Sequence, residues 1–137
     1  MSDLRTFRPG SSRIVAYGVA VIMIVLTTVI GVALPSYVTF SPLELATLAA
    51  MLVAVLALLH GVGRSYVRAG DDSIEVLNGY RRHSVPWSEI AGFSMKDGAP
   101  WPTMVHGDDE RLILFAIQSS DGRYADEAMA YLRDRLT

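Results

Sequence analysis

The spacing of hydrophobic positions along this chain changes near Gly63. Before that point, two long apolar runs, Ile14–Leu34 and Leu45–Val62, are separated by a short connection. The first run carries no charge. As a helix rising about 1.5 Å per residue it would be roughly 31 Å long, enough to cross the ~30 Å hydrocarbon core of a bilayer. The pattern predicts a transmembrane helical hairpin over residues 14–63, with spans at 14–34 and 42–63.

The flanks of the hairpin predict its orientation. The connection Pro35–Ser41 contains no Lys or Arg, whereas Arg13 and Arg64 flank the other end. Cytoplasmic loops of membrane proteins are enriched in these residues, so we expect a multi-pass protein of the plasma (inner) membrane with both termini cytoplasmic. Ser41-Pro42-Leu43-Glu44 predicts a helix N-terminal capping box. A proton-transfer role is the alternative for Glu44, since carboxylates within membranes are often functional.

A cleaved signal peptide is an alternative reading of the first run. Basic residues precede the run, and Gly31-Val32-Ala33 resembles a cleavage site. The run is, however, longer than the apolar core of about 7–15 residues in a typical signal peptide, and a second span follows it. We therefore expect the run to remain as a span and residues 1–13 to form a mobile cytoplasmic tail.

Small residues line one side of the second span. Ala46, Ala50, Ala54 and Ala57 lie within about 80° of arc on a helical wheel, and leucines cluster nearly opposite them. Small side chains let two helix backbones approach closely in lipid, whereas Leu suits contact with acyl chains. We expect this alanine stripe to pack on the first span. The competing use of the stripe is a homodimer.

Beyond Gly63 the apolar positions alternate, as in short strands. The expected strands are Tyr66–Arg68, Ser73–Leu77, Tyr80–Val85, Ala91–Lys96, Pro102–His106 and Arg111–Ile117. Leu112–Ile117 is the most apolar stretch, so we place it centrally in the sheet. Asn78-Gly79 is typical of a two-residue type I′ hairpin turn, which would pair Glu75 directly with Arg82.

The chain ends in an amphipathic helix capped by Ser120 or Asp121. Its apolar face contains Ala125, Ala128, Met129, Leu132 and Leu136. The expected fold class is α+β with a membrane anchor: a two-helix transmembrane hairpin, then a small antiparallel β-sheet or barrel of about six strands with a C-terminal helix. The domain division is a tail at 1–13, the hairpin at 14–63 and the β domain at 64–137.

Composition narrows the classes of function. Residues 64–137 contain nine basic and twelve acidic side chains, a net charge of −3. A nucleic-acid-binding domain would need a basic patch, so we expect no nucleic-acid partner. The chain has no cysteine, which excludes disulfides and thiolate metal sites.

Four segments of residues 64–137 occur in an order that resembles that of a known family of domains. They are Ser73–Asn78, Val85–Ile90 with its Pro86-Trp87 pair, Leu112–Gln118 and Tyr131–Arg133. They resemble the bacterial pleckstrin-homology (PH) domains of the low-molecular-weight protein antigen type, common in actinobacteria and often preceded by two membrane spans. The resemblance covers Ser65–Thr137 and implies a PH-like fold in a membrane setting, without catalysis. This stretch is shorter than a full PH domain, which implies a missing or merged strand.

The ligand of the best-known PH domains is not expected here. PH domains that bind phosphoinositides carry a basic motif in and around their first strand-to-strand loop. The corresponding loop, Ala69–Asp72, is acidic. We expect no phosphoinositide recognition by residues 65–137, and attachment to the lipid bilayer through the hairpin alone.

Several side chains are candidates for an interaction surface. Arg64, Arg68, Arg81 and Arg82 could form a basic rim that faces anionic headgroups. The alternative is that Arg64 and Arg68 determine topology while the other two pair within the sheet. Trp101, between two prolines, is expected to be exposed and to meet the membrane interface or a partner. Trp87 is expected to be a buried structural anchor.

The residues carry no pattern typical of an active site. His83 and His106 lack a metal-ligand spacing, and no nucleophile motif or phosphate loop is present. We expect no catalytic residue, metal or cofactor. The expected function is a non-enzymatic membrane protein that presents a cytoplasmic PH-like module to an unknown membrane or cytoplasmic protein, or to the membrane surface. The alternative is a small accessory subunit of a membrane complex that interacts through the hairpin.

Overall fold

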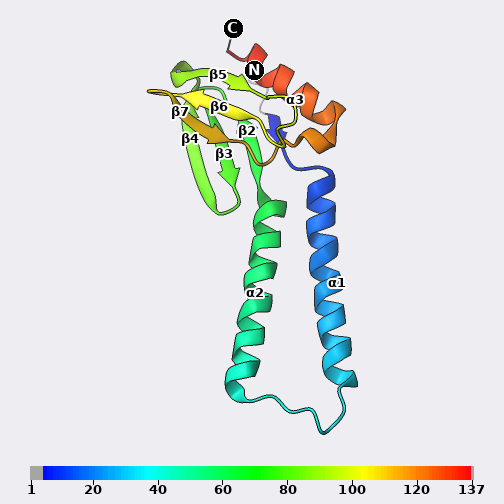
Figure 1. The fold of residues 1–137 in the computed structure, drawn as a ribbon. Helices are drawn as coiled ribbons and strands as arrows, with labels where there is room; N and C mark the ends of the chain where they lie inside the picture. The colour runs from blue at the N-terminus through cyan, green and yellow to red at the C-terminus, as the bar shows by residue number, and fades with distance from the viewer. Residues whose placement is uncertain (1–4, 137) are drawn as a thin grey trace.

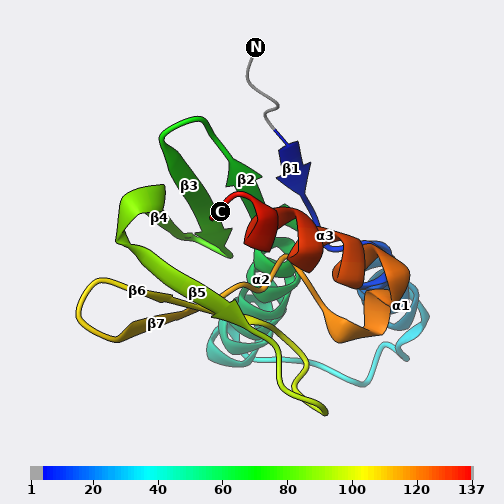
Figure 2. The ribbon, with the colours of Figure 1, turned by 90° about the horizontal axis from the view of Figure 1, so that it is seen from above.

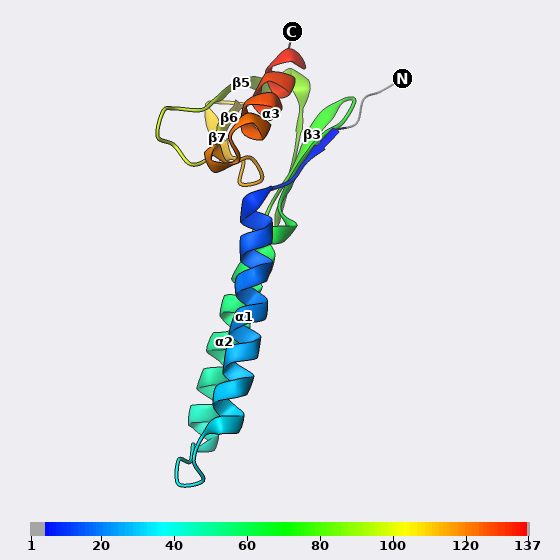
Figure 3. The same ribbon diagram turned by 90° about the vertical axis from the view of Figure 1, so that its right-hand side faces the viewer.

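The computed structural model describes residues 5–136 as a helical hairpin and a β domain (Figure 1). Helices α1 (Ser11–Ala33) and α2 (Pro42–Arg64) extend side by side away from the domain (Figure 3). Both are long and apolar enough to cross a membrane, and only 6% of the most apolar window of each is buried. A core helix of a soluble protein would be mostly buried, so this exposed apolar surface indicates membrane association.

The second helix begins as its sequence predicts. Ser41 Oγ accepts a hydrogen bond from the Glu44 backbone N–H at 3.2 Å, and the Ser41 N–H donates to Glu44 Oε2 at 2.8 Å. Pro42 occupies the first helical position. The capping box is therefore confirmed, and it engages the Glu44 carboxylate at the end of the hairpin far from the domain.

The segment before α1 is not a free tail. Strand β1 (Arg5–Phe7) pairs antiparallel with β2 (Tyr66–Ala69). Phe7 is only 1% exposed, and its ring packs edge-on against the rings of Tyr124 and Tyr131. The expectation of a mobile tail is wrong for residues 5–13; Met1–Leu4 lie outside the described residues. The strand that the short PH-like stretch lacked comes from before the first helix.

The β domain contains two antiparallel sheets. One has the order β1-β2-β3-β4 with β3 (Ser73–Asn78) and β4 (Arg81–Pro86). The 3-10 turn η1 (Trp87–Glu89) leads to the other sheet, which consists of β5 (Ile90–Ser94), β6 (Thr103–His106) and β7 (Glu110–Ile113). The core lies between the sheets and α3 (Arg123–Asp134), which covers the opening between them (Figure 2).

The fold class is confirmed, with seven strands in the described residues instead of about six. The apolar face of α3 is also confirmed, since Ala125, Ala128, Met129 and Leu132 are buried. The cap of α3 differs from the prediction. Ser119–Asp121 forms a separate 3-10 turn, η2, and Gly122, with φ at 57°, precedes the helix.

The register of the β3–β4 hairpin differs from the prediction by one position. Asn78 pairs with Arg81, so Gly79 and Tyr80 form the two-residue loop. Gly79 has φ at 64° and Tyr80 does not have positive φ, a combination that fits a type II′ turn instead of type I′. Glu75 therefore lies opposite Ser84, although it still reaches Arg82 diagonally on the same face of the sheet.

The most apolar stretch, Leu112–Ile117, is not a central strand. The strand ends at Ile113, and β7 lies at the edge of its sheet. The Asn78 side chain explains the end of the ladder. Its Nδ2 donates to the Ile113 carbonyl at 2.5 Å, and its Oδ1 accepts from the Phe115 N–H at 3.2 Å. The backbone groups that a longer strand would pair are thus already bonded.

The rotation of α2 is also opposite to the prediction. Leu52, Leu56 and Leu59 are half-buried, whereas the alanine stripe, Ala46, Ala50, Ala54 and Ala57, is exposed. A contact near the domain fixes this rotation. Gly63 lies so close to Tyr17 of α1 that a Cβ atom on Gly63 would be 2.4 Å from the ring. The leucine side of α2 consequently turns towards α1.

Candidate functional site at the junction of helices and domain

The second helix enters the domain without a linker. Only Ser65 separates α2 from β2, and it is buried. Ser65 Oγ donates to the Gly61 carbonyl and accepts from the Gly79 N–H, both at 2.9 Å. At the tip of the β3–β4 hairpin, the Tyr80 hydroxyl donates to the Ala57 carbonyl at 2.5 Å. The hairpin tip therefore lies beside the last two turns of α2 (Figure 1).

The N-terminus of α1 is held by the segment between β7 and α3. The Asp121 carboxylate accepts hydrogen bonds from the Gly10 N–H at 3.2 Å, the Ser11 N–H at 3.1 Å and Ser11 Oγ at 2.9 Å. Ser12 Oγ also donates to Gln118 Oε1. A carboxylate is favoured at a helix N-terminus, where backbone N–H groups lack intrahelical partners. Both helices are thus fixed to the domain by direct contacts.

An apolar groove of about 480 Å³, which we name the junction groove, opens where these elements meet. One wall comes from Leu58, Gly61 and Val62 of α2, and the hairpin tip contributes Tyr80. Trp101 and Phe115 also line the groove, with ring centroids 5.0 Å apart and an interplanar angle of 89°. Trp101 is half-buried here, not exposed as the sequence suggested.

Three polar side chains of the groove are already hydrogen-bonded within the protein. Ser65 and Asn78 make the bonds described above, and Gln118 Nε2 donates to the Phe115 carbonyl at 3.3 Å. The charged side chain of the lining is Arg81, which is exposed. Its guanidinium has no hydrogen-bond or ion-pair partner among residues 5–136. The groove therefore offers an apolar surface with one uncompensated cation.

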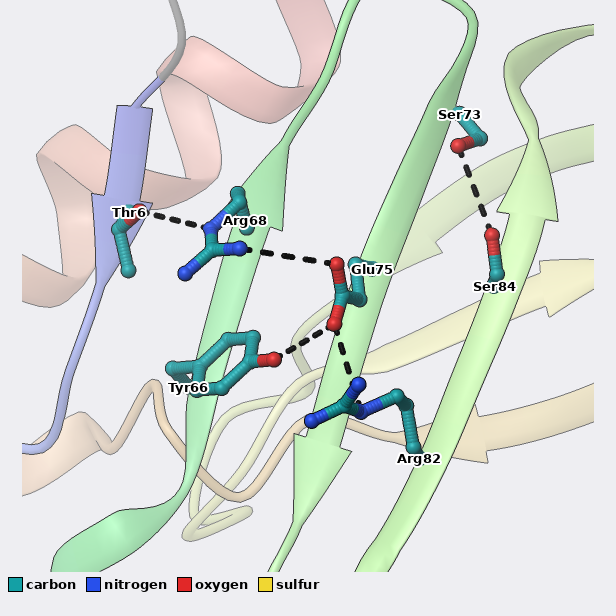
Figure 4. Close-up of polar contacts among 7 residues, drawn as sticks. All are labelled: Thr6, Tyr66, Arg68, Ser73, Glu75, Arg82 and Ser84. Carbon is teal, nitrogen blue, oxygen red and sulfur yellow. Dashed lines mark hydrogen bonds and ion pairs between the residues drawn. The ribbon is translucent and has the colours of Figure 1, made fainter.

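The arginines predicted to form a rim are divided between two places. Arg68 and Arg82 lie on the outer face of the first sheet, at either side of Glu75 (Figure 4). Arg68 Nη1 is 3.7 Å from Glu75 Oε2, and Arg82 Nε is 3.4 Å from Glu75 Oε1. The Tyr66 hydroxyl donates to Glu75 Oε1 at 2.6 Å. We name these four side chains the Glu75 network.

The remaining arginine belongs to the junction. The Arg64 guanidinium carbon lies 5.1 Å from the centroid of the Tyr80 ring, within range of a cation–π interaction. Tyr80 and Phe115 were not among the residues expected from the sequence to form an interaction surface. An aromatic residue directly after Asn78-Gly79, at the tip of a hairpin, was the one signal that could have identified Tyr80.

The Glu75 network perturbs one titratable group. The hydrogen bond to the Glu75 carboxylate raises the pKa of Tyr66, and burial and the negative charge of Glu75 act in the same direction. Each of these causes favours the neutral phenol over the phenolate. The cations Arg82 and Arg68 oppose the shift in the pKa of Tyr66.

Trp87 lies at the other end of β2 from the groove. It is half-buried against the core, and its Nε1 donates to the Gly70 carbonyl at 2.9 Å. Arg135 Nη2 donates to the same carbonyl at 2.6 Å, and its guanidinium carbon is 5.1 Å from the Trp87 ring centroid. Trp87 thus links η1 to the β2–β3 turn and to the C-terminal end of the described chain.

The two histidines considered for metal binding lie apart from this site. His83 is on β4, and His106 Nε2 is 4.0 Å from Glu110 Oε2 at the β6–β7 turn. Across residues 5–136, no group of three His, Cys, Asp or Glu side chains is arranged to hold a metal ion.

Comparison with known proteins identifies the domain. Residues 64–135, more than half of the chain, match the profile of the family described as bacterial PH domain. The chain belongs to the bacterial PH domain family. The match confirms the fold that the sequence suggested. Strand β1 of this bacterial PH domain protein lies outside the matched residues, so the sheet is completed by a segment from beyond the family's own domain.

Relatives extend the similarity over almost the whole chain. Uncharacterised proteins of Mycobacterium bovis and Mycobacterium tuberculosis are 28% identical over 132 residues, which cover 94% of this chain and 86% of each relative. These are actinobacterial proteins, as the resemblance implied. No solved structure matches the chain. The family is a non-catalytic interaction module, which gives no support to an enzymatic function.

Proposed function

We propose that this protein is a non-enzymatic adaptor of the plasma membrane. The helical hairpin spans the bilayer, both termini are cytoplasmic, and the PH domain is presented to a protein partner at the membrane surface. One observation carries the proposal: the domain is bonded to both helices instead of being tethered by a linker. Ser65 joins α2 to β2, and Asp121 holds the start of α1.

Charge supports the proposed orientation. Arg13 and Arg64 lie at the domain end of α1 and α2, whereas the connection Pro35–Ser41 at the far end contains no basic residue. The positive-inside tendency then favours a cytoplasmic domain. A domain fixed in this way exposes the same faces to the cytoplasm at all times. This arrangement suits the binding of a partner at a fixed distance from the membrane surface.

Photo-crosslinking in cells tests the adaptor. A photoreactive residue replaces Ser84 on β4 or Arg111 on β7 of the full chain, two exposed positions away from the junction groove. The same residue is placed at Ala50 and Ala54 of α2 as a matched set. We expect adducts with another protein from the domain positions. Adducts formed only from α2 would contradict the adaptor.

The second candidate function is an accessory subunit of a membrane complex. The exposed alanine stripe of α2 favours it, because this surface faces away from α1 and suits close helix packing in lipid. Adducts from Ala50 and Ala54 with a different membrane protein would support the subunit. Adducts of the chain with itself at these positions would instead indicate a homodimer.

A further inference from the structure

We infer that the junction groove binds one anionic phospholipid of the cytoplasmic leaflet, with an acyl chain along the apolar walls and the phosphate on Arg81. The inference rests on the proposed function in one respect, the placement of α1 and α2 across the membrane. It goes beyond that function because it assigns a ligand to a site built from both the helix and the domain.

The groove lies at the level where a lipid can enter it. Leu58 and Val62 belong to the last two turns of α2 before Arg64, where the span meets the headgroups. Leu58 is 71% exposed and Val62 is 41% exposed, so the wall of the groove continues into the lipid-facing surface of the helix. An acyl chain can therefore pass from the bilayer into the groove without crossing water. Tyr80 and Trp101 are also the residue types enriched at this level.

The chemistry of the lining selects the class of ligand. Because Ser65, Asn78 and Gln118 already make hydrogen bonds within the protein, a polar ligand would find few free partners in the groove. Apolar walls from Val62, Phe115 and Trp101 suit hydrocarbon. The unpaired guanidinium of Arg81 at the same groove suits a phosphate, for which Arg is well matched. An amphiphile with one anionic group meets both conditions.

The acidic loop Ala69–Asp72, which the sequence suggested as the counterpart of the basic loop of phosphoinositide-binding PH domains, joins β2 to β3 at the end of β2 away from the groove. Because β1 is the first strand of the sheet, the first strand-to-strand connection is instead the helical hairpin between β1 and β2. The junction groove also needs α2 for one wall. A fragment of residues 65–137 should therefore fail to bind anionic vesicles even if the full chain holds a lipid.

The two tryptophans of the chain provide a matched pair of probes. Trp101 lines the groove, whereas Trp87 lies at the other end of β2. The full chain carrying Trp87→Phe is reconstituted into phosphatidylcholine vesicles and titrated with phosphatidylglycerol brominated on its acyl chains. The same chain is titrated with brominated phosphatidylcholine. We expect phosphatidylglycerol to quench Trp101 at a mole fraction about fivefold lower, as one favourable Arg contact predicts.

Substitutions then assign the preference to one side chain. Arg81→Gln should make the two quenching curves coincide, and Arg81→Lys should restore part of the difference. Arg82→Gln removes the same charge from the neighbouring residue in the Glu75 network and should leave the preference unchanged. The reciprocal chain with Trp101→Phe should show little quenching of Trp87 by either lipid.

Three results would overturn the inference. Equal curves for the two lipids before substitution would mean that the groove recognises no headgroup. An equal effect of Arg82→Gln and Arg81→Gln would mean that a general field attracts the lipid. Trp101 quenching no greater than that of Trp87 would mean that lipid does not enter, as when an apolar peptide fills the groove. Failure of the proposed function is seen separately, as loss of the chain from vesicles on alkaline extraction or as adducts confined to α2.

Discussion

Arg81 and Arg82 are neighbours in the sequence but belong to two different kinds of site. Successive side chains of a strand point to opposite faces, so Arg82 joins the Glu75 network on the outer face while Arg81 reaches the junction groove. In the Glu75 network, one carboxylate lies within ion-pairing distance of two guanidinium groups and accepts a hydrogen bond from Tyr66. In the groove, the single cation is left unpaired beside an apolar surface. The first arrangement stabilises the sheet, and the second is suited to recognition.

The largest loss of stability should come from removing a side chain of the domain core, on which both regions depend. Phe7 is buried, and we expect Phe7→Ala to lower the free energy of unfolding by about 3–5 kcal/mol, the range for deleting a buried aromatic ring. That is a large part of the stability of a small domain. Pulse proteolysis of the full chain in detergent measures the change. Little change would show that β1 does not belong to the domain core. Thr6→Ser, which keeps the exposed hydroxyl that accepts from Arg68 Nε, is the surface control on the same strand.

The next largest effects on stability should come from the two tryptophans, and they should differ between the core and the junction groove. We expect Trp87→Ala to cost about 2 kcal/mol, because the ring is only half-buried but also donates to Gly70 and stacks with Arg135. Trp101→Ala should cost about 1 kcal/mol, the scale of its edge-on pair with Phe115. Chemical unfolding of the full chain checks the order. A larger loss at Trp101 would make the groove a part of the core.

The most direct comparison of the two regions is between Glu75 of the Glu75 network and Arg81 of the junction groove. Glu75→Gln should destabilise the domain by about 1–2 kcal/mol, since it weakens charge-assisted contacts to Arg68, Arg82 and Tyr66 at once. Arg81→Gln should change stability by less than about 0.5 kcal/mol, as for most surface substitutions. Unfolding curves of the two variants decide the matter. A loss at Arg81 equal to that at Glu75 would remove the distinction between a structural and a recognition site.

The smallest effect should be a dependence on pH. The pKa of Tyr66 is raised in the folded protein by the Glu75 hydrogen bond. Its contribution to stability is therefore complete below the unfolded pKa near 10, and it is lost as pH rises through the higher folded pKa. Stability should fall more steeply above about pH 10 in the wild-type chain than in Tyr66→Phe. Parallel profiles for the two chains would show that the hydroxyl is not held by Glu75.

Local patterns in the sequence predicted the parts of the fold that local contacts determine. The capping box at Ser41 and the apolar face of α3 depend on residues within a few turns, and both were predicted correctly. Strand β1 was missed because three residues form a strand only when β2, which is distant in sequence, pairs with them. The register of the β3–β4 hairpin was not predicted because the Asn78 side chain bonds to Ile113 and Phe115, and residues so distant in sequence do not enter a local turn rule.

The candidate site was harder to predict than the fold. Arg81 and Trp101 were selected from the sequence, but nothing in their spacing showed that they line the same groove. The rotation of α2 was also missed, because the contact between Gly63 and Tyr17 fixes it and a helical wheel contains no information about the neighbouring helix. The groove is assembled from α2, the hairpin tip and two loops, so only the tertiary structure brings its walls together.

The pairing of β1 with β2 has a consequence for biosynthesis. The strand before the first helix is translated first, yet it cannot find its partner until the second helix and β2 have left the ribosome. A chain whose first helix inserted in the reverse direction would carry Phe7 to the opposite side of the bilayer and leave its place in the core empty. Such a chain would present an incomplete sheet to the proteases of the cell. Under the proposed topology, the domain can therefore be completed only in chains whose two helices cross the bilayer in opposite directions.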